Sequence, residues 1–449
     1  MGNKSITPKN PPKYHTENPS KPPENLPKSI QNDSKTKTLT QKVILPEIKP
    51  FPSDPKPSTP LEPEKKQSVD PVDINTPEPS LSTPTDLIRN SSENPPEDPV
   101  IEENKGKSEE LKPNPEQLIT DSQLNSALGC VIGAFIGDSL GSAIEFQRTV
   151  SDSDLKKALS MNGGIFGNGP GQVTDDSELA MCILNGICES LPSLSPDSIA
   201  KYYKQWISSH PFDIGRTTRN AFASLLKSET NLAKAAKTSS RISNQDSLSN
   251  GSFMRSSPLA VYCRHLSTEE TEKVVFEDSS MTHSNPLIHQ TETMYILCLS
   301  HLIQCPKDRE GALKRVIQYA EGCSEGAKTW IADAFDDAKA MPGNPKMGFV
   351  KIAFDHSFRE LRKDNIDFHA ALSSVLLLGG DTDTNAAIVG AMIGAYVGYN
   401  DLPKDWKDKV EAFGSGIWGI SRPEFLNQRA VKGMVERVFR EAPTTLVLS

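Results

Sequence analysis

The stretch Gly379-Gly380-Asp381-Thr382-Asp383-Thr384-Asn385 is followed directly by a small, apolar run over residues 386–398. The two glycines allow a sharp turn, and the run is long enough for a buried helix. We therefore expect both carboxylates at a helix N-terminus, where free amides and the helix dipole favour negative charge. One carboxylate could be a simple cap. Two carboxylates with two hydroxyls are also suitable oxygen ligands for a hard divalent cation, so a cap and a metal site both remain open.

A similar pattern occurs about two hundred residues earlier in the chain. Thr174-Asp175-Asp176 follows a glycine-rich segment and precedes an amphipathic helical pattern with Leu179, Ile183 and Ile187 on one side. Thr174 is suited to the N-cap, and the two aspartates are suited to the first turn. If the two helix starts meet in space, four carboxylates share one site. They could not stay ionised together without cations, which predicts two bound divalent ions.

Residues 125–146 read as a single buried helix. Glycines recur on one of its faces at positions 129, 133, 137 and 141. Because glycine weakens a helix, this spacing predicts close approach of another element. Asp138 and Glu145 are expected two turns apart on the same side, among small and apolar neighbours. The alternatives are two exposed acids at a tight helix crossing, or a buried acid that needs a cation or another partner.

Composition divides the chain into two parts. Of its 35 prolines, 23 precede residue 118, whereas all seven cysteines and all four tryptophans follow it. Residues 1–117 are polar and proline-rich, so they cannot bury enough surface to offset the entropy of ordering, and we predict a disordered tail. Residues 118–449 are long enough for one folded domain. Helical patterns dominate there and strand signals are sparse, which predicts an all-α fold.

Several classes of protein are disfavoured by the sequence. The net charge of −9 and the absence of a basic stripe argue against nucleic acid as a partner. The polar start is not a secretory signal, and no uninterrupted apolar run of 18 residues predicts a membrane span. The scattered cysteines lack metal-ligand spacing, which favours reduced thiols in an intracellular protein. We expect a cytoplasmic location and leave a nuclear one open.

The tail carries only weak motifs. Gly2 begins an imperfect N-myristoylation signal, because Ile6 stands where Ser or Thr is required. Proline spacings such as Pro8-Lys9-Asn10-Pro11 could dock polyproline-reading proteins, although such matches arise by chance in a segment so rich in proline. The tail therefore reads as a solvated tether with unidentified protein partners.

Two further motifs are ambiguous alone. The amides around Asn250-Gly251-Ser252 could cradle a phosphate ahead of a helix, although a plain turn explains them equally well. His283 could cap the helix that follows it or face a ligand.

Taken in order, these motifs resemble the ADP-ribosylglycohydrolase family. The matching pieces are Gly137-Asp138 to Glu145-Phe146, Gly171-Gln172 with Thr174-Asp175-Asp176, Asn250-Gly251 with Met254-Arg255, Thr282-His283, and Gly379–Thr384. The resemblance implies an all-α fold with a binuclear Mg²⁺ or Mn²⁺ site. It implies metal ligands at Thr174, Asp175, Asp176, Asp381, Asp383 and Thr384. It also implies a substrate path along Asn250, Gly251, Ser252 and Met254, with His283 near the substrate.

The activity implied by the resemblance is hydrolysis of the glycosidic bond that links ADP-ribose to a protein side chain or small conjugate. Its transition state resembles an oxocarbenium ion. Glu145, as a ligand or acid–base group, and the aspartates Asp176 and Asp381 are the candidate catalytic carboxylates. One alternative is a non-catalytic ADP-ribose-binding or structural descendant. Another is a metal-dependent phosphohydrolase, against which the lack of Arg or Lys near either aspartate motif counts.

Overall fold

A computed structural model describes residues 121–449 except 345 and 415, and within these residues the fold is all-α, as predicted. The described residues form no strand, only isolated bridges between Leu194 and Leu448 and between Ser249 and Phe349. The predicted disordered tail, residues 1–117, and the lipidation motif at Gly2 lie outside the described residues. The helices are α1 (Ser122–Gly141), α2 (Asp152–Leu159), α3 (Asp175–Ser190), α4 (Pro196–Ser208), α5 (Arg216–Phe222), α6 (Leu232–Ser243), α7 (Ser257–Tyr262), α8 (Thr268–Ser279), α9 (Pro286–Gln304), α10 (Arg309–Glu321), α11 (Glu325–Ala334), α12 (Val350–Leu361), α13 (Phe368–Leu376), α14 (Thr382–Val397), α15 (Lys404–Ala412) and α16 (Val431–Glu441).

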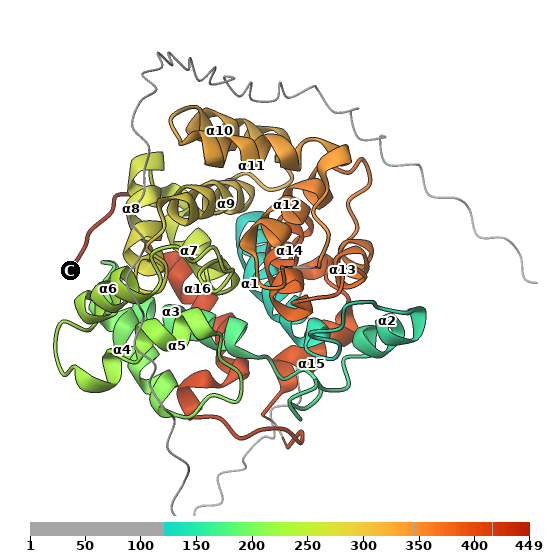
Figure 1. Cartoon of the computed structure of the whole chain (residues 1–449), viewed down its shortest axis with the longest axis horizontal. Helices are drawn as coiled ribbons and strands as arrows, with labels where there is room; N and C mark the ends of the chain where they lie inside the picture. Colours follow the sequence, from blue (N-terminus) through green and yellow to red (C-terminus); the bar gives the residue numbers. More distant parts are fainter. Residues whose placement is uncertain (1–120, 345, 415) are drawn as a thin grey trace, which may run out of the picture. The chain divides into compact units, whose positions relative to one another are not determined.

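The fold is built around an antiparallel pair of buried helices, α1 and α14, which lie side by side in Figure 1. The glycine face of α1 makes this contact. A Cβ added at Gly129 would lie 2.2 Å from Gly394 O, and one added at Gly133 would lie 2.4 Å from Gly390 O. Gly390 and Gly394 on α14 meet α1 in the same way. The predicted close approach is therefore confirmed, and its partner is the helix after the aspartate motif.

This antiparallel packing brings the end of α1 to the beginning of α14. Thr382 Oγ1 donates to Gly141 O at 2.8 Å, and Phe146 N–H donates to Gly380 O at 2.7 Å. The predicted helix over residues 125–146 is too long, because α1 ends at Gly141. Glu145 therefore lies in the following turn rather than two helical turns beyond Asp138. Both acids are buried, which rules out the exposed alternative.

The core helices are apolar on nearly every side. α1 reaches the length and mean hydropathy of a membrane span, with 20 residues at 1.3, but 89% of that window is buried within the described protein. α14 is likewise buried over almost its whole length. A helix that packs on all its faces has no amphipathic stripe. In these two helices, the small residues instead indicate where the two backbones are in contact.

Candidate metal centre

The aspartate motif stands at the start of α14, as predicted. Asp381 occupies the N-cap position and Asp383 the first turn, yet the Asp381 side chain accepts no capping hydrogen bond. It accepts instead from Asn250 Nδ2, at 2.9 Å. A cap alone therefore does not account for this carboxylate. Two αL glycines, Gly379 and Gly380, turn the chain into the helix with φ of 67° and 80°.

The start of α3 is organised by a residue from α1. Thr174 holds the N-cap position, but its side chain does not cap the helix. Asp138 does so instead, accepting from the backbone N–H of Thr174 at 3.0 Å and of Ser177 at 3.1 Å. The Thr174 hydroxyl donates to Asp138 Oδ1 at 2.9 Å and to Asp176 Oδ2 at 3.2 Å. The capping role predicted for Thr174 is therefore wrong, because a buried carboxylate satisfies these amides more strongly.

The two helix starts meet, and their carboxylates form two groups that could each hold a metal ion. Asp138, Asp176 and Asp383 place one oxygen each within 4.8 Å of one another, and so do Glu145, Asp381 and Asp383. Asp383 is common to both groups. Glu145 Oε2 and Asp176 Oδ1 are buried and accept no hydrogen bond from any described residue. Buried carboxylate oxygens without donors are the expected surroundings of divalent cations, so the residues present fit such ions.

Electrostatics support the same interpretation. Burial, followed by the charges of Asp213 and Asp381, raises the pKa of Glu145 to about 9. Burial raises the pKa of Asp138 to about 7, despite the hydrogen bonds from Ser177 and Thr174. Without cations the cluster therefore retains protons near neutral pH, and bound cations would favour the ionised carboxylates.

The pKa values of the three remaining buried aspartates are raised for the same reasons. The pKa values of Asp175, Asp176 and Asp383 lie well above their ordinary range, because of burial first and neighbouring carboxylates second. The most deeply buried ion pairs of the described residues involve other carboxylates, those of Asp278, Asp355 and Glu178. Compensation by an internal ion pair is therefore not what holds the cluster together.

A cavity of about 290 Å³ opens over the second carboxylate group. Eight of the twelve predicted site residues line it: Glu145, Asp175, Asn250, Gly251, Met254, Asp381, Asp383 and Thr384. These residues come from the turn after α1, the start of α3, the segment before α7 and the start of α14. The structure thus brings together segments that are far apart in the sequence.

Four predicted residues do not line this cavity. Thr174 and Asp176 are fully buried behind it, where they can contribute ligand oxygens but cannot touch a substrate in the cavity. Ser252 points away and donates to the buried Glu292 Oε2 at 2.6 Å. His283 is also buried, with Nε2 2.8 Å from Ser249 Oγ. It does not cap α9, because Asn285 does; burial lowers the pKa of His283 to about 3, so this imidazole is neutral.

Sequence reasoning missed two charged residues of the cavity, Asp213 and Arg216. Burial, followed by the charge of Asp381, raises the pKa of Asp213 to about 6. Arg216 begins α5 and is the single basic side chain among the described residues that line the cavity. The available signal was the start of a helix at Gly215, with an acid two residues before it and a base directly after it.

Met347 and Gly348 form another missed wall of the cavity. Gly348 has a φ of 73°, and a Cβ there would lie 3.3 Å from Asp381 Oδ2. Its carbonyl accepts from Asn250 N–H at 3.1 Å. A side chain at this position would therefore be strained and would crowd the carboxylates.

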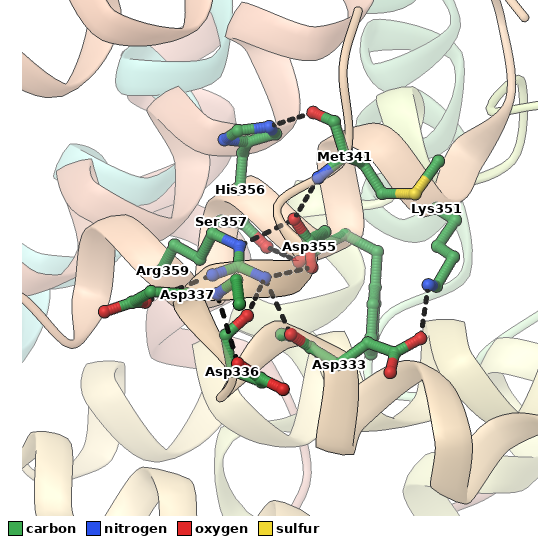
Figure 2. Close-up of polar contacts among 12 residues, drawn as sticks. Asp333, Asp336, Asp337, Met341, Lys351, Asp355, His356, Ser357 and Arg359 are labelled. Carbon is green, nitrogen blue, oxygen red and sulfur yellow. Dashed lines mark hydrogen bonds and ion pairs between the residues drawn. The ribbon is translucent and has the colours of Figure 1, made fainter.

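Figure 2 shows the buried polar network that anchors Met341, which precedes this wall in the chain, to α12. Arg359 Nε donates to Asp355 Oδ2 at 2.7 Å, and Asp355 Oδ2 also accepts from Met341 N–H at 3.0 Å. His356 Nε2 lies 2.6 Å from Met341 O. Arg359 further donates to the carbonyls of Asp333 and Asp336. Because Asp355 is fully buried, its ion pair with Arg359 compensates the cost of burial, and the network fixes the position of Met341.

Several known proteins resemble this chain over more than half of its length. A model of the ADP-ribosylglycohydrolase family matches residues 119–443. An Acanthamoeba polyphaga mimivirus protein, named provisionally as an ADP-ribosyl glycohydrolase, is 33% identical over 311 residues, covering 63% of this chain and 90% of its own length. ADP-ribosylarginine hydrolase Tri1 of Serratia proteamaculans is 25% identical, with 76% and 86% covered. ADP-ribosyl-[dinitrogen reductase] glycohydrolase of Rhodospirillum rubrum is 24% identical, with 64% and 90% covered.

A solved structure described as an ADP-ribosylglycohydrolase-related protein complex shares the fold. Its TM-score is 0.56 at 17% identity, and the match covers 71% of this chain and 98% of that chain. The family match extends over both aspartate motifs and over every residue that lines the cavity. The chain therefore belongs to the ADP-ribosylglycohydrolase family.

Proposed function

We propose that this protein is a Mg²⁺-dependent hydrolase that cleaves the glycosidic bond between ADP-ribose and a protein side chain or small conjugate. The observation that carries the proposal is the pair of carboxylate groups that share Asp383 beneath an open cavity. Family membership supports the same reaction class. Both aspartate motifs are complete, which disfavours a non-catalytic descendant.

Two ions would be held by residues of both helix starts. Asp176 and Asp383 would hold one ion, with Asp138 behind them, and Glu145, Asp381 and Asp383 would hold the other. Thr174, Asp175 and Thr384 complete the proposed ligand set. Two divalent cations supply positive charge that orients ribose hydroxyls and favours deprotonation of water. Mn²⁺ has the same ligand preference and could replace Mg²⁺.

Proton transfer falls to the carboxyls that face the cavity. Glu145 and Asp213 both line it, and their pKa values of about 9 and about 6 differ in the cation-free protein. Two carboxyls in different protonation states can serve as acid and base at a glycosidic bond. Bound cations would lower the pKa of Glu145, which makes Asp213 a further candidate for holding the transferred proton.

The negative charge of the substrate's diphosphate requires a positive charge at the other end of the cavity. Carboxylates dominate the lining, and Arg216 is the single cation there among the described residues. We infer that Arg216 faces the diphosphate, with Asn250, Gly251 and Met254 along the path to the ribose. A phosphohydrolase would need basic side chains beside the aspartates to hold the phosphate. The single arginine on the rim of the cavity does not meet that need, which disfavours the phosphohydrolase alternative.

The test is release of ADP-ribose from arginine-linked and serine-linked ADP-ribosylated peptides, with Mg²⁺ or with EDTA. Asp381→Asn and Asp383→Asn are compared with Asp408→Asn, an exposed carboxylate on α15. We expect release that requires Mg²⁺, is lost in the first two variants and is kept in the third. Binding of ADP-ribose without release from either peptide would favour the binding-protein alternative. Absence of both would refute the proposal.

We also propose a cytoplasmic location, where the seven free cysteines of this chain would stay reduced. The substrate, an ADP-ribosylated protein or conjugate, would be met there. Antibody detection in fractionated cells would test this, and recovery of the protein in a secreted fraction would contradict it.

A further inference from the structure

A second set of side chains of metal-ligating types lies where α9 connects to α10. His301 stands in the last turn of α9, Cys305 is the C-cap residue directly after that helix, and Asp308 is the N-cap of α10. One imidazole nitrogen, the thiol sulfur and one carboxylate oxygen all lie within 4.8 Å of one another. The set is at the opposite end of α9 from His283, and a helix of 19 residues is about 28 Å long.

Ordinary helix capping explains only part of this cluster. Asp308 Oδ1 accepts from Gly311 N–H at 2.9 Å, and Asp308 Oδ2 lies 2.9 Å from His301 Nε2. A cap and an ion pair thus account for the carboxylate and the imidazole. They do not account for the thiol beside them, and Cys305 is the one cysteine of the seven that is not buried.

The backbone is adapted to bring these groups together. Lys307 adopts a φ of 68°, in the left-handed region that favours glycine, as the chain turns back toward His301. At Gly311 an added Cβ would lie 2.2 Å from Asp308 Oδ2 and 2.5 Å from His301 Nε2. Glycine inside a helix costs about 1 kcal/mol relative to alanine. Glycine at this position therefore leaves space for Asp308 Oδ2 and His301 Nε2.

The neighbouring cations direct their charged groups elsewhere. Lys307 Nζ donates to Val397 O at 3.0 Å, and Arg309 Nη1 donates to Lys363 O at 2.6 Å. The side chain of Asp308 is about half exposed and that of His301 is partly exposed. A cation from solvent can therefore reach both groups.

We propose that His301, Cys305 and Asp308 bind one Zn²⁺ ion, with water as the fourth ligand. A mixed set of nitrogen, sulfur and oxygen suits a borderline transition metal, whereas Mg²⁺ selects oxygen ligands. On binding, the thiol proton passes to solvent, and the neutral imidazole of His301 carries its one proton on Nδ1, so that Nε2 is free to coordinate in place of its hydrogen bond to Asp308. Asp308 Oδ1 retains its cap to Gly311. Three protein ligands leave one coordination position open to water.

Co²⁺ is the probe for this site, because a thiolate–cobalt bond gives a charge-transfer band in the near ultraviolet. The carboxylate centre contains no cysteine and cannot produce this band. We expect the full chain, freed of metal by chelation, to develop the band with one equivalent of Co²⁺ and to lose it on addition of Zn²⁺. Cys305→Ser should abolish the band, whereas Cys323→Ser and Asp383→Asn should keep it.

Two further variants test the other ligands without removing the thiol. His301→Ala should weaken Co²⁺ binding by more than about tenfold, since even a residue behind a ligand contributes that much. Gly311→Ala should weaken it as well, by filling the space of the two ligand atoms. Absence of the band in the unmodified chain at saturating Co²⁺, or a band that survives Cys305→Ser, would overturn the proposal.

Discussion

Replacing Gly133 by alanine tests the contact on which the fold is built. The new Cβ would lie 2.4 Å from Gly390 O, whereas ordinary contacts begin at 3.4 Å, so the backbones must separate by about 1 Å. Both partners are backbone, and no side chain can rotate aside. Overpacking of this kind costs about 1–3 kcal/mol. The gain in helix propensity offsets up to about 1 kcal/mol of that.

We expect the overpacking cost of Gly133→Ala to lie near the upper end of this range, because neighbouring glycine contacts open with it. Less the gain in helix propensity, the free energy of unfolding should fall by about 2 kcal/mol. Urea unfolding followed by circular dichroism measures this difference. The matched control is Gly433→Ala on α16, where a Cβ meets nothing within 4 Å. That change should stabilise the protein by about 0.5–1 kcal/mol.

Gly133→Ala should also weaken metal binding, because separating α1 from α14 moves Glu145 relative to Asp383. A Gly133→Ala protein as stable as the unmodified chain, alongside a stabilised Gly433→Ala protein, would refute the packing argument. It would mean that α1 and α14 do not approach as closely as the glycine spacing requires.

Three further predictions concern the site. Because the pKa of Glu145 is raised to about 9, the folded state keeps a proton that the unfolded state releases above about pH 4.5, so the Tm of the metal-free protein should fall as pH rises toward 9. Added Mg²⁺ should raise the Tm most at the high end of that range, as measured by scanning calorimetry. Arg216→Ala should weaken ADP-ribose binding by about tenfold in titration calorimetry, the equivalent of about 1.4 kcal/mol for a lost charge-assisted contact. Arg359→Ala leaves Asp355 buried without its partner and should cost about 3–5 kcal/mol of stability in urea unfolding.

Each of the three predictions can be contradicted by a specific result or compared with a control variant. For the pH series, a Tm that rises from pH 5 to pH 9 without metal would contradict the raised carboxyl pKa. Arg216→Lys should recover part of the affinity because it keeps the charge, and equal affinity in Arg216→Ala would remove this residue from the diphosphate path. Arg437→Ala, which breaks an exposed pair on α16, should change stability by less than about 1 kcal/mol.

Local patterns along the chain were sufficient to predict the helix starts. The stretch around Asp381 contains a glycine turn, a carboxylate pair and an apolar run within twenty residues. Backbone geometry alone is enough to predict from this pattern a turn followed by a helix start. The spacing of glycines on α1 likewise predicted a close helix contact. The small, apolar neighbours of Asp138 and Glu145 indicated a buried acid that needs a cation or another partner, although two exposed acids remained an alternative. These features are properties of single segments, so the sequence determines them.

Which segments meet was decided only by the tertiary structure. Asp138 replaces Thr174 as the cap of α3 because the crossing of α1 places its carboxylate on those amides. Ser252 and His283 carry suitable chemistry but turn behind the cavity, whereas Asp213 and Arg216 turn into it. The direction of a side chain in a loop depends on what packs against that loop from distant parts of the chain. No local periodicity encodes that contact. The helix starts and most of the carboxylates could therefore be predicted from the sequence, whereas the loop side chains that enter the cavity could not.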